Sequence, residues 1–115
     1  MDAKPDFHIW LDREQFFTVG RILKKNWHVS DLGEVCFKVA AGKLLISSQR
    51  GGAEIPCEGV GEITAIISAR QYWSLIASRG HEKKPSGRME LVFRPEFGEV
   101  AIDVAGIKAK FPKAQ

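Results

Sequence analysis

The sequence predicts an α+β fold made of two successive units, each containing one strand, one helix and three further strands. Short runs of β-branched and aromatic residues end at glycine-containing turns, which is typical of β-hairpins. Two amphipathic segments each begin with a residue that can cap a helix. The segment EVCFKVAAGKLLI at 34–46 also returns as ELVFRPEFGEVAI at 90–102, so both halves of the chain follow the same order.

The first unit is expected at about residues 7–59. It begins with a strand at 7–11, where FHIWL is rich in aromatic and branched side chains. Asp12 can accept hydrogen bonds from the first helical turn, and Gln15 can reach back to it, so a helix is predicted from Asp12 to about Lys25. Strands are predicted at 34–40, 43–48 and 53–57, with glycines between them that permit the positive φ of tight turns.

This first helix is predicted to have one apolar side and one basic side. The apolar residues at helical spacing are Phe16, Val19, Ile22 and Leu23, and they predict a packed face. Phe17 falls nearer the basic side by helical phase. We interpret it as lying beneath the segment around Trp27, with stacking on a base or insertion into a partner's pocket as alternatives.

The second unit is expected at about residues 62–112. A strand at 63–67 leads to Ser68, which can cap a helix with Gln71 in the reciprocal position. That helix, with the sequence ARQYWSLIAS, is predicted to end at Gly80. After the polar segment HEKKPSG, strands are predicted at 88–94, 99–104 and 107–111.

A single shift of 56 positions aligns the two units without a gap. It pairs caps with caps and turn glycine with turn glycine, as in Asp12 with Ser68 and Gly42 with Gly98. Further pairs are Gln15 with Gln71, Glu34 with Glu90, Phe37 with Phe93, Lys38 with Arg94, Ala53 with Ala109 and Pro56 with Pro112. Eight of 52 aligned pairs are identical. A duplicated unit explains this pattern. The alternative is that any two βαβββ units come to show this degree of similarity without a duplication.

The arrangement resembles a domain of the DNA sliding clamps, the ring-shaped processivity factors of DNA polymerases. The resemblance rests on the segments VCFKVAAGKLLISS, AEIPCEG and GEITAIISARQYWSLI, and it extends from about Phe7 to Phe111. It implies a single clamp-like domain over 1–115, with two pseudo-symmetric βαβββ units and two helices packed side by side on antiparallel sheets. About six copies would be needed to close a ring, joined by pairing between sheet edges.

The resemblance also implies a role for the helices. In sliding clamps the helices line the ring and place basic side chains against the phosphates of double-stranded DNA, without base recognition. The matching positions here are Arg13, Arg21, Lys24, Lys25 and Arg70, with Arg79, Lys83 and Lys84 at or after the end of the second helix. The second helix carries Ser74 and Ser78 where a DNA-facing helix favours lysine or arginine.

Composition and spacing narrow the functional classes. Hydrophobic residues form 44% of the chain and charged residues 27%, which predicts a folded domain rather than a disordered segment. The net charge of +3 suits an acidic partner. No apolar run is long enough to cross a membrane and no signal peptide is evident, so we expect a cytoplasmic protein with reduced, buried cysteines.

No catalytic or metal-binding motif is evident. His8, His28 and His81 are far apart, and the spacings typical of zinc sites, phosphate-binding loops and serine hydrolases are missing. We therefore expect neither a metal nor a cofactor and no enzymatic activity. The predicted function is a DNA-associated, self-assembling clamp-like protein. The alternatives are a protein interaction module that uses the same fold without DNA, and an enzyme whose carboxylates converge only in three dimensions.

Overall fold

The computed structural model describes residues 6–25, 33–48, 51–79, 87–102 and 105–112, apart from the side chains of residues 24, 78, 79 and 105. In chain order the elements are β1 Phe7–Asp12, α1 Arg13–Lys25, β2 Glu34–Ala40, β3 Lys43–Ser48, β4 Gly51–Glu58, β5 Ile63–Ser68, α2 Ala69–Arg79, β6 Arg88–Arg94, a short 3₁₀ turn Pro95–Phe97, β7 Glu99–Ile102 and β8 Ala105–Lys110. The predicted α+β class is confirmed.

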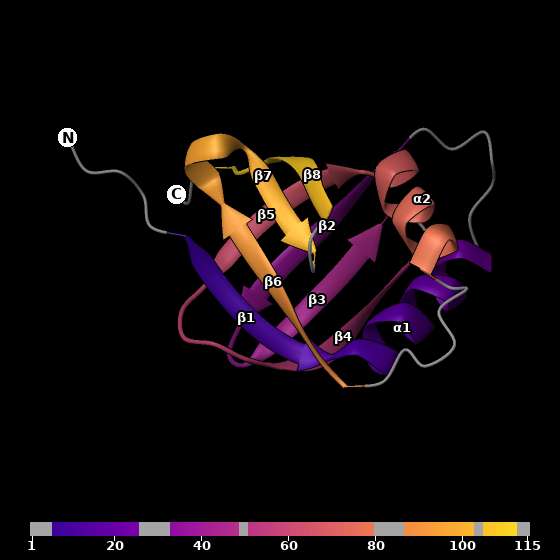
Figure 1. Ribbon diagram of the computed structural model, residues 1–115, viewed down its shortest axis with the longest axis horizontal. Coiled ribbons are helices and arrows are strands. Elements are labelled where there is room, and N and C mark those ends of the chain that lie inside the picture. The colour runs from indigo at the N-terminus through magenta and orange to yellow at the C-terminus, as the bar shows by residue number, and fades with distance from the viewer. Residues whose placement is uncertain (1–5, 26–32, 49–50, 80–86, 103–104, 113–115) are drawn as a thin grey trace.

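The eight strands are antiparallel and close into a barrel in the order β1-β4-β3-β2-β5-β8-β7-β6. The two helices lie beside each other at one end of this barrel (Figure 1). Each helix continues directly from a strand, α1 from β1 and α2 from β5. The barrel therefore determines where both helices begin, and their inner faces pack over one opening of the barrel.

The two halves of the barrel have matching strand pairings. Leu11 of β1 pairs with Met89 of β6, and in the other half Ile67 of β5 pairs with Val35 of β2. The junctions β1–β4 and β5–β8 correspond in the same way, as do β2–β3 with β6–β7 and β3–β4 with β7–β8. A half-turn of the barrel thus exchanges the two sets of strands.

The start of each helix is also the same in both halves. The backbone N–H of Gln15 donates to Asp12 Oδ2 at 3.0 Å, and that of Gln71 donates to Ser68 Oγ at 3.4 Å, so both predicted caps are present. The first helical N–H groups are satisfied by the opposite unit, because Arg13 donates to the carbonyl of Gly87. The equivalent donor in the second half, Ala69, donates to the carbonyl of Gly33.

The single shift of 56 positions is wrong for two of the four strand pairs. Glu34 at the start of β2 corresponds to Arg88, a shift of 54, and Ala53 of β4 corresponds to Ala105, a shift of 52. The β2–β3 connection has two residues and the β6–β7 connection has four, while the β7–β8 hairpin is shorter than β3–β4. All the shifts are even, so the inward and outward faces are preserved.

The correction changes which aromatic residues are equivalent. Phe37 corresponds to Leu91 rather than to Phe93. Phe37 lies against the helices, with its ring centroid 6.3 Å from that of Phe16 and 5.7 Å from that of Tyr72. Phe93 instead packs edge-on against Phe7 at the start of β1. The two phenylalanines therefore fill different parts of the core.

The buried face of α1 is rotated from the predicted one. Ile22, predicted to pack, is 54% exposed, whereas Phe17, predicted to lie near the basic side, is buried in edge contact with Phe16. Gly20 accounts for the rotation. A Cβ added at Gly20 would lie 2.5 Å from Cδ1 of Ile76, so α1 approaches α2 closely along its glycine. Trp27, beneath which Phe17 was expected, lies outside the described residues.

Tyr72 carries a polar group into this core. Its side chain is fully buried, and its hydroxyl has no hydrogen-bond partner among the residues that the structure describes. A buried hydroxyl without a partner costs about 1–3 kcal/mol. We expect Tyr72→Phe to raise the free energy of unfolding by about 1 kcal/mol, measured by urea denaturation at neutral pH. A loss of stability would show that the hydroxyl has a partner.

Tyr72→Phe should also change how the stability of the protein depends on pH in alkaline solution. Burial raises the pKa of the Tyr72 phenol, so the folded protein keeps the proton above about pH 10 while the unfolded chain loses it. The contribution of Tyr72 to stability then falls as pH rises, by up to about 1.4 kcal/mol per pH unit, and Tyr72→Phe removes this contribution while leaving that of the two cysteine thiols. Tyr72 is the only tyrosine, so tyrosinate absorbance reports on this side chain alone. Titration of the folded protein at pH 10 would contradict the prediction.

Candidate functional site

Two grooves lie where the barrel closes by the shortest strand pairings. At the β1–β4 junction the paired residues are Trp10 with Glu58 and Leu11 with Cys57. At the β5–β8 junction the residue pairs are Ile66 with Lys110 and Ile67 with Ala109. Because the strands diverge beyond these pairs, the surface is hollowed beside each junction, and we call the hollows the β1–β4 groove and the β5–β8 groove.

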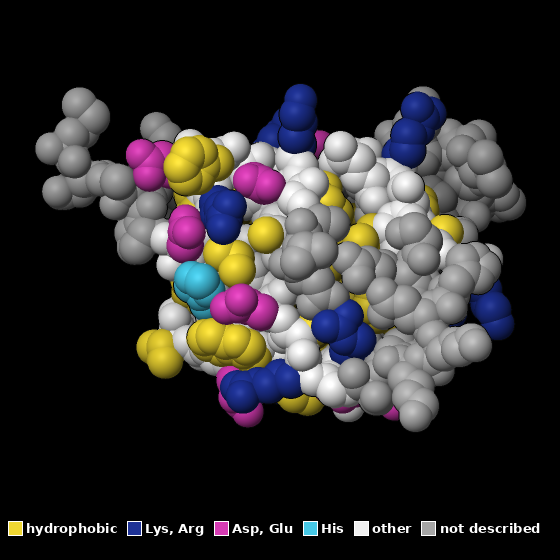
Figure 2. Space-filling model, viewed as in Figure 1, with side chains coloured by type: hydrophobic (Ala, Val, Ile, Leu, Met, Phe, Trp, Pro, Cys, Tyr) yellow, Lys and Arg dark blue, Asp and Glu magenta, His cyan; other side chains and the backbone are white. Residues whose placement is uncertain are grey.

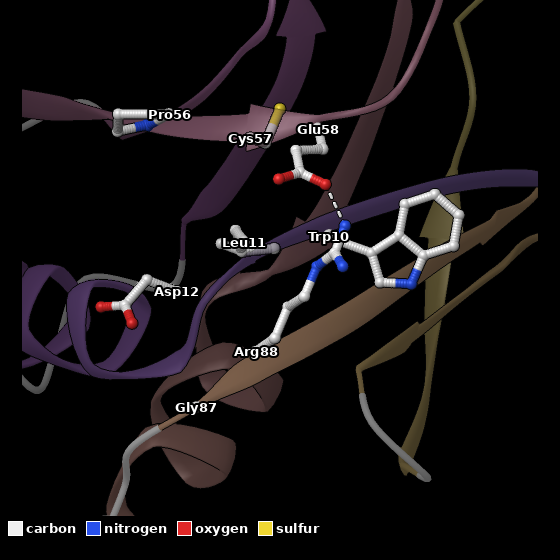
Figure 3. Close-up of a pocket in the computed structure, with 8 residues that line it drawn as sticks. All are labelled: Trp10, Leu11, Asp12, Pro56, Cys57, Glu58, Gly87 and Arg88. Carbon is white, nitrogen blue, oxygen red and sulfur yellow. Dashed lines mark hydrogen bonds and ion pairs between the residues drawn. The ribbon is translucent and has the colours of Figure 1, made fainter.

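The β1–β4 groove has a volume of about 310 Å³ and is shown in Figure 3. Its lining includes Trp10, Asp12, Pro56, Cys57, Glu58 and Arg88. The Arg88 guanidinium forms an ion pair with Glu58 and also lies over the indole of Trp10, 5.6 Å from the ring centroid. His8 stacks on the same indole at 6.1 Å and its Nδ1 is 2.8 Å from Glu90 Oε2. This groove combines an aromatic wall with paired charges.

The β5–β8 groove is larger, about 620 Å³, and its charge differs. Its lining includes Glu34, Ile66, Arg70, Gln71, Lys108 and Lys110. Lys110 Nζ lies 3.6 Å from Glu34 Oε2, and both side chains are exposed. Lys108 and Lys110 alternate along β8 and so point to the same outer face of the strand.

The two grooves are structural equivalents with opposite charge. The pairing correspondence places Arg88 where Glu34 stands and Glu58 where Lys110 stands, so each groove holds an ion pair and the signs are exchanged. With two acids and one arginine, the β1–β4 groove has a net charge of −1, whereas three cations and one acid give the β5–β8 groove +2. The matching backbones therefore present different electrostatic surfaces.

The basic residues predicted from the sequence are only partly brought together. Arg21 and Lys25 are exposed on the outer side of α1, where Glu14 is also exposed, and Arg21 donates to Thr18 Oγ1 at 3.4 Å. Arg13 is half-buried. Arg70 lines the β5–β8 groove, and no residue of α1 lines that groove. The side chains of Lys24 and Arg79, and the whole of Lys83 and Lys84, lie outside the described residues.

Sequence reasoning missed Lys108 and Lys110. Their alternation with Ile107 and Ala109 was visible as a strand pattern, with the lysines outward. Nothing in the linear sequence placed these lysines beside Arg70, which lies about forty positions earlier, because the β5–β8 pairing creates that proximity. Predicting this cluster would have required knowing that β5 pairs with β8.

Among the described residues, the surface around β1 and β6 carries charges of both signs. In Figure 2, which views the molecule from the side on which β1 and β6 cross in front, acidic and basic side chains alternate with hydrophobic ones. Phe97, 71% exposed, and Trp10, 36% exposed, are the large apolar side chains that the described residues present from the 3₁₀ turn and β1. This face offers scattered apolar contacts rather than an anionic or cationic surface.

Both cysteines are half-buried rather than fully buried as predicted. Burial raises the pKa of the Cys36 and Cys57 thiols, which favours the protonated form, whereas a reactive cysteine needs a lowered pKa. Cys57 is nonetheless the sulfur that lines the β1–β4 groove. Within the described ranges, no three histidine, cysteine or acidic side chains gather as a metal site.

Comparisons with models of protein families and with curated proteins found no match to this chain. None of the helices in the described part of the chain has the length and apolar character needed to cross a membrane. The functional assignment therefore depends on the fold and on the charges that it brings together.

Proposed function

We propose that this chain is a non-enzymatic, clamp-like domain that self-associates and contacts the phosphates of double-stranded DNA. The observation that carries the proposal is the two-fold correspondence of strand pairings and helix starts, with both helices at one end of the barrel. A pair of βαβββ units with adjacent helices is the arrangement by which the sequence resembles sliding-clamp domains.

The helical side supplies the first candidate DNA contacts. Arg21 and Lys25 are exposed on α1, on the side of the helix away from the core. The charged ends of these two side chains therefore extend into solvent. Contacts of this kind hold a phosphate backbone without reading its sequence and weaken as salt rises. Glu14 on the same exposed side reduces the local positive charge, which limits the strength of contact expected from α1 alone.

Self-association has two candidate edges. Of the eight residues of β4, Cys57 and Glu58 pair with β1, which leaves residues 51–56 with one strand neighbour among the described residues. In β8, Ala109 and Lys110 pair with β5, which leaves residues 105–108 in the same situation. Edges of this kind can pair with another chain. A ring would then use a different edge on each side of every subunit, as a head-to-tail interface requires.

The proposal predicts salt-sensitive binding of a labelled random-sequence duplex, measured by fluorescence anisotropy, with the mass of free and bound protein measured by light scattering. Removing the two α1 charges in Arg21→Gln/Lys25→Gln should weaken binding up to about ten-fold at low salt. The control Lys38→Gln/Lys43→Gln removes the same charge from exposed positions on β2 and β3. Absence of duplex binding by the native protein at low salt would refute the DNA role, and a strict monomer would refute self-association.

A second candidate function is a protein interaction module that uses this fold without DNA. The β1–β4 groove favours it, because Trp10 and Pro56 provide the aromatic and apolar surface that protein interfaces prefer at their centres. Under this alternative, a bound partner would protect Trp10 from solvent and change its fluorescence, while the charge variants on α1 would have no effect on binding.

A further inference from the structure

We infer that the β5–β8 groove is a second phosphate-binding surface, which holds the backbone of double-stranded DNA through Arg70, Lys108 and Lys110. The inference rests on the proposed DNA contact and adds to it a surface outside the exposed side of α1. It applies to chains whose β8 edge is not paired with another chain, because strand pairing at residues 105–108 would cover Lys108. The groove brings together cations from two elements, α2 and β8, in a hollow large enough to admit part of a nucleic-acid backbone.

The charges in this groove are incompletely neutralised. Glu34 pairs with Lys110 at 3.6 Å, but neither Arg70 nor Lys108 forms an ion pair with another residue in the described parts of the chain. The lining of the groove therefore has a net charge of +2. A concave basic surface attracts a polyanion.

The geometry of β8 suits a regularly spaced anion. Lys108 and Lys110 are two residues apart on one face of a strand, which places their Cα atoms about 7 Å apart. Successive phosphates along a nucleic-acid strand are separated by a comparable distance. The two lysines can therefore contact neighbouring phosphates of one strand, and Arg70 can add a bidentate contact from the other wall of the groove.

The lining also favours duplex DNA over the other polyanions that the charge alone would admit. An acidic protein partner would need an aromatic or large apolar anchor, and single-stranded DNA would need aromatic rings on which bases stack. The groove has no aromatic side chain, and its apolar side chains are Ile66 and Ala109, among four charged residues and Gly33, Ser68 and Gln71. The equivalent β1–β4 groove has Trp10 and Pro56 but a net charge of −1, so the same backbone geometry there lacks the charge for DNA.

The inference is tested by anisotropy titrations of a labelled random-sequence duplex over a range of salt concentrations. We expect Arg70→Gln/Lys108→Gln to weaken binding about ten-fold at low salt and to lower the slope of log Kd against log salt by about 2. The control Lys38→Gln/Lys43→Gln has the same net charge and should change binding much less. All of these side chains are exposed, and far-UV circular dichroism with thermal unfolding checks that each variant is folded.

A matched pair of acid substitutions tests for gain of binding, which unfolding cannot imitate. Glu34→Gln removes the acid from the β5–β8 groove and should tighten binding, by up to about five-fold. Glu58→Gln removes the equivalent acid from the ion pair of the β1–β4 groove. Glu54→Gln on β4 makes the same change in net charge outside both grooves and serves as the control. The affinity of Glu58→Gln for DNA should lie within two-fold of that of Glu54→Gln. Equal effects of Glu34→Gln and Glu58→Gln would overturn the inference.

Comparison with the α1 variant separates this inference from the proposed α1 contact. Weaker binding in Arg70→Gln/Lys108→Gln, with Arg21→Gln/Lys25→Gln unchanged, would support the groove and reject the α1 contact. The reverse result would reject the groove and leave the α1 contact standing. An equal, small effect of both double variants and of the lysine control would reject both surfaces.

Discussion

Replacing Phe37 by alanine is expected to lower the free energy of unfolding by about 3–5 kcal/mol, a large part of the stability of a domain of this size. The Phe37 side chain is fully buried, and its ring makes edge contacts with Phe16 of α1 and Tyr72 of α2. Truncation removes apolar burial from the point where the barrel meets both helices, and the neighbouring rings cannot fill the cavity without moving. Urea denaturation gives the change directly.

Phe97→Ala is the matched control for this prediction. It removes the same atoms from a side chain that is 71% exposed, so its effect should remain within about 0.5 kcal/mol. Equal costs for Phe37→Ala and Phe97→Ala would mean that Phe37 is not at the centre of the core. Phe93→Ala should also be costly, because Phe93 is fully buried, but its contact with Phe7 places that loss away from the helices.

Replacing Gly20 by leucine is expected to lower the free energy of unfolding by about 1–2 kcal/mol. A Cβ at this position would lie 2.8 Å from Cγ1 of Ile76 and 3.0 Å from Oη of Tyr72, and the longer leucine side chain would extend farther into occupied space. Overpacking of this kind costs about 1–3 kcal/mol and occasionally more, while the gain in helix propensity returns about 1 kcal/mol at most. Thermal and urea denaturation should agree on the loss.

Two variants show whether the loss arises from the contact between the helices. Thr18→Leu places the same side chain on the exposed side of α1 and should have little effect. In the double variant Gly20→Leu/Ile76→Ala the smaller side chain makes room for the larger one. Its destabilisation should therefore be at least about 1 kcal/mol less than the sum of the two single changes. Strict additivity would show that Gly20 and Ile76 are not packed together.

Local chemistry explains which parts of the fold could be predicted from the sequence. Asp12 and Ser68 cap their helices through neighbours three residues away, so the sequence alone was sufficient to identify both caps. Gly42 and Gly98 adopt positive φ values of 75° and 60° at the turns where the prediction placed them. Short runs of β-branched and aromatic residues ending at glycine-containing turns likewise predicted β2, β3 and β6 with the bounds that the structure has.

Features that depend on distant segments were not predictable in the same way. The rotation of α1, which exposes Ile22 and buries Phe17, follows from the approach of α2 at Gly20, and helical periodicity on one helix contains no information about the other. The shifts of 54 and 52 positions arise from different connection lengths, which a gapless comparison cannot represent. Even shifts kept the burial pattern, and this is why the gapless alignment still identified the core faces.

For this protein, then, the sequence by itself determined the order of the elements, their caps and turns, and which side of each strand is apolar, because these depend on residues within a few positions of one another. Tertiary structure decided the closure of the barrel, the equivalence of Phe37 with Leu91, and the meeting of Arg70 with Lys108 and Lys110. Those features arise from pairing between strands far apart in the chain, where register and connection length, rather than local preference, determine which side chains become neighbours.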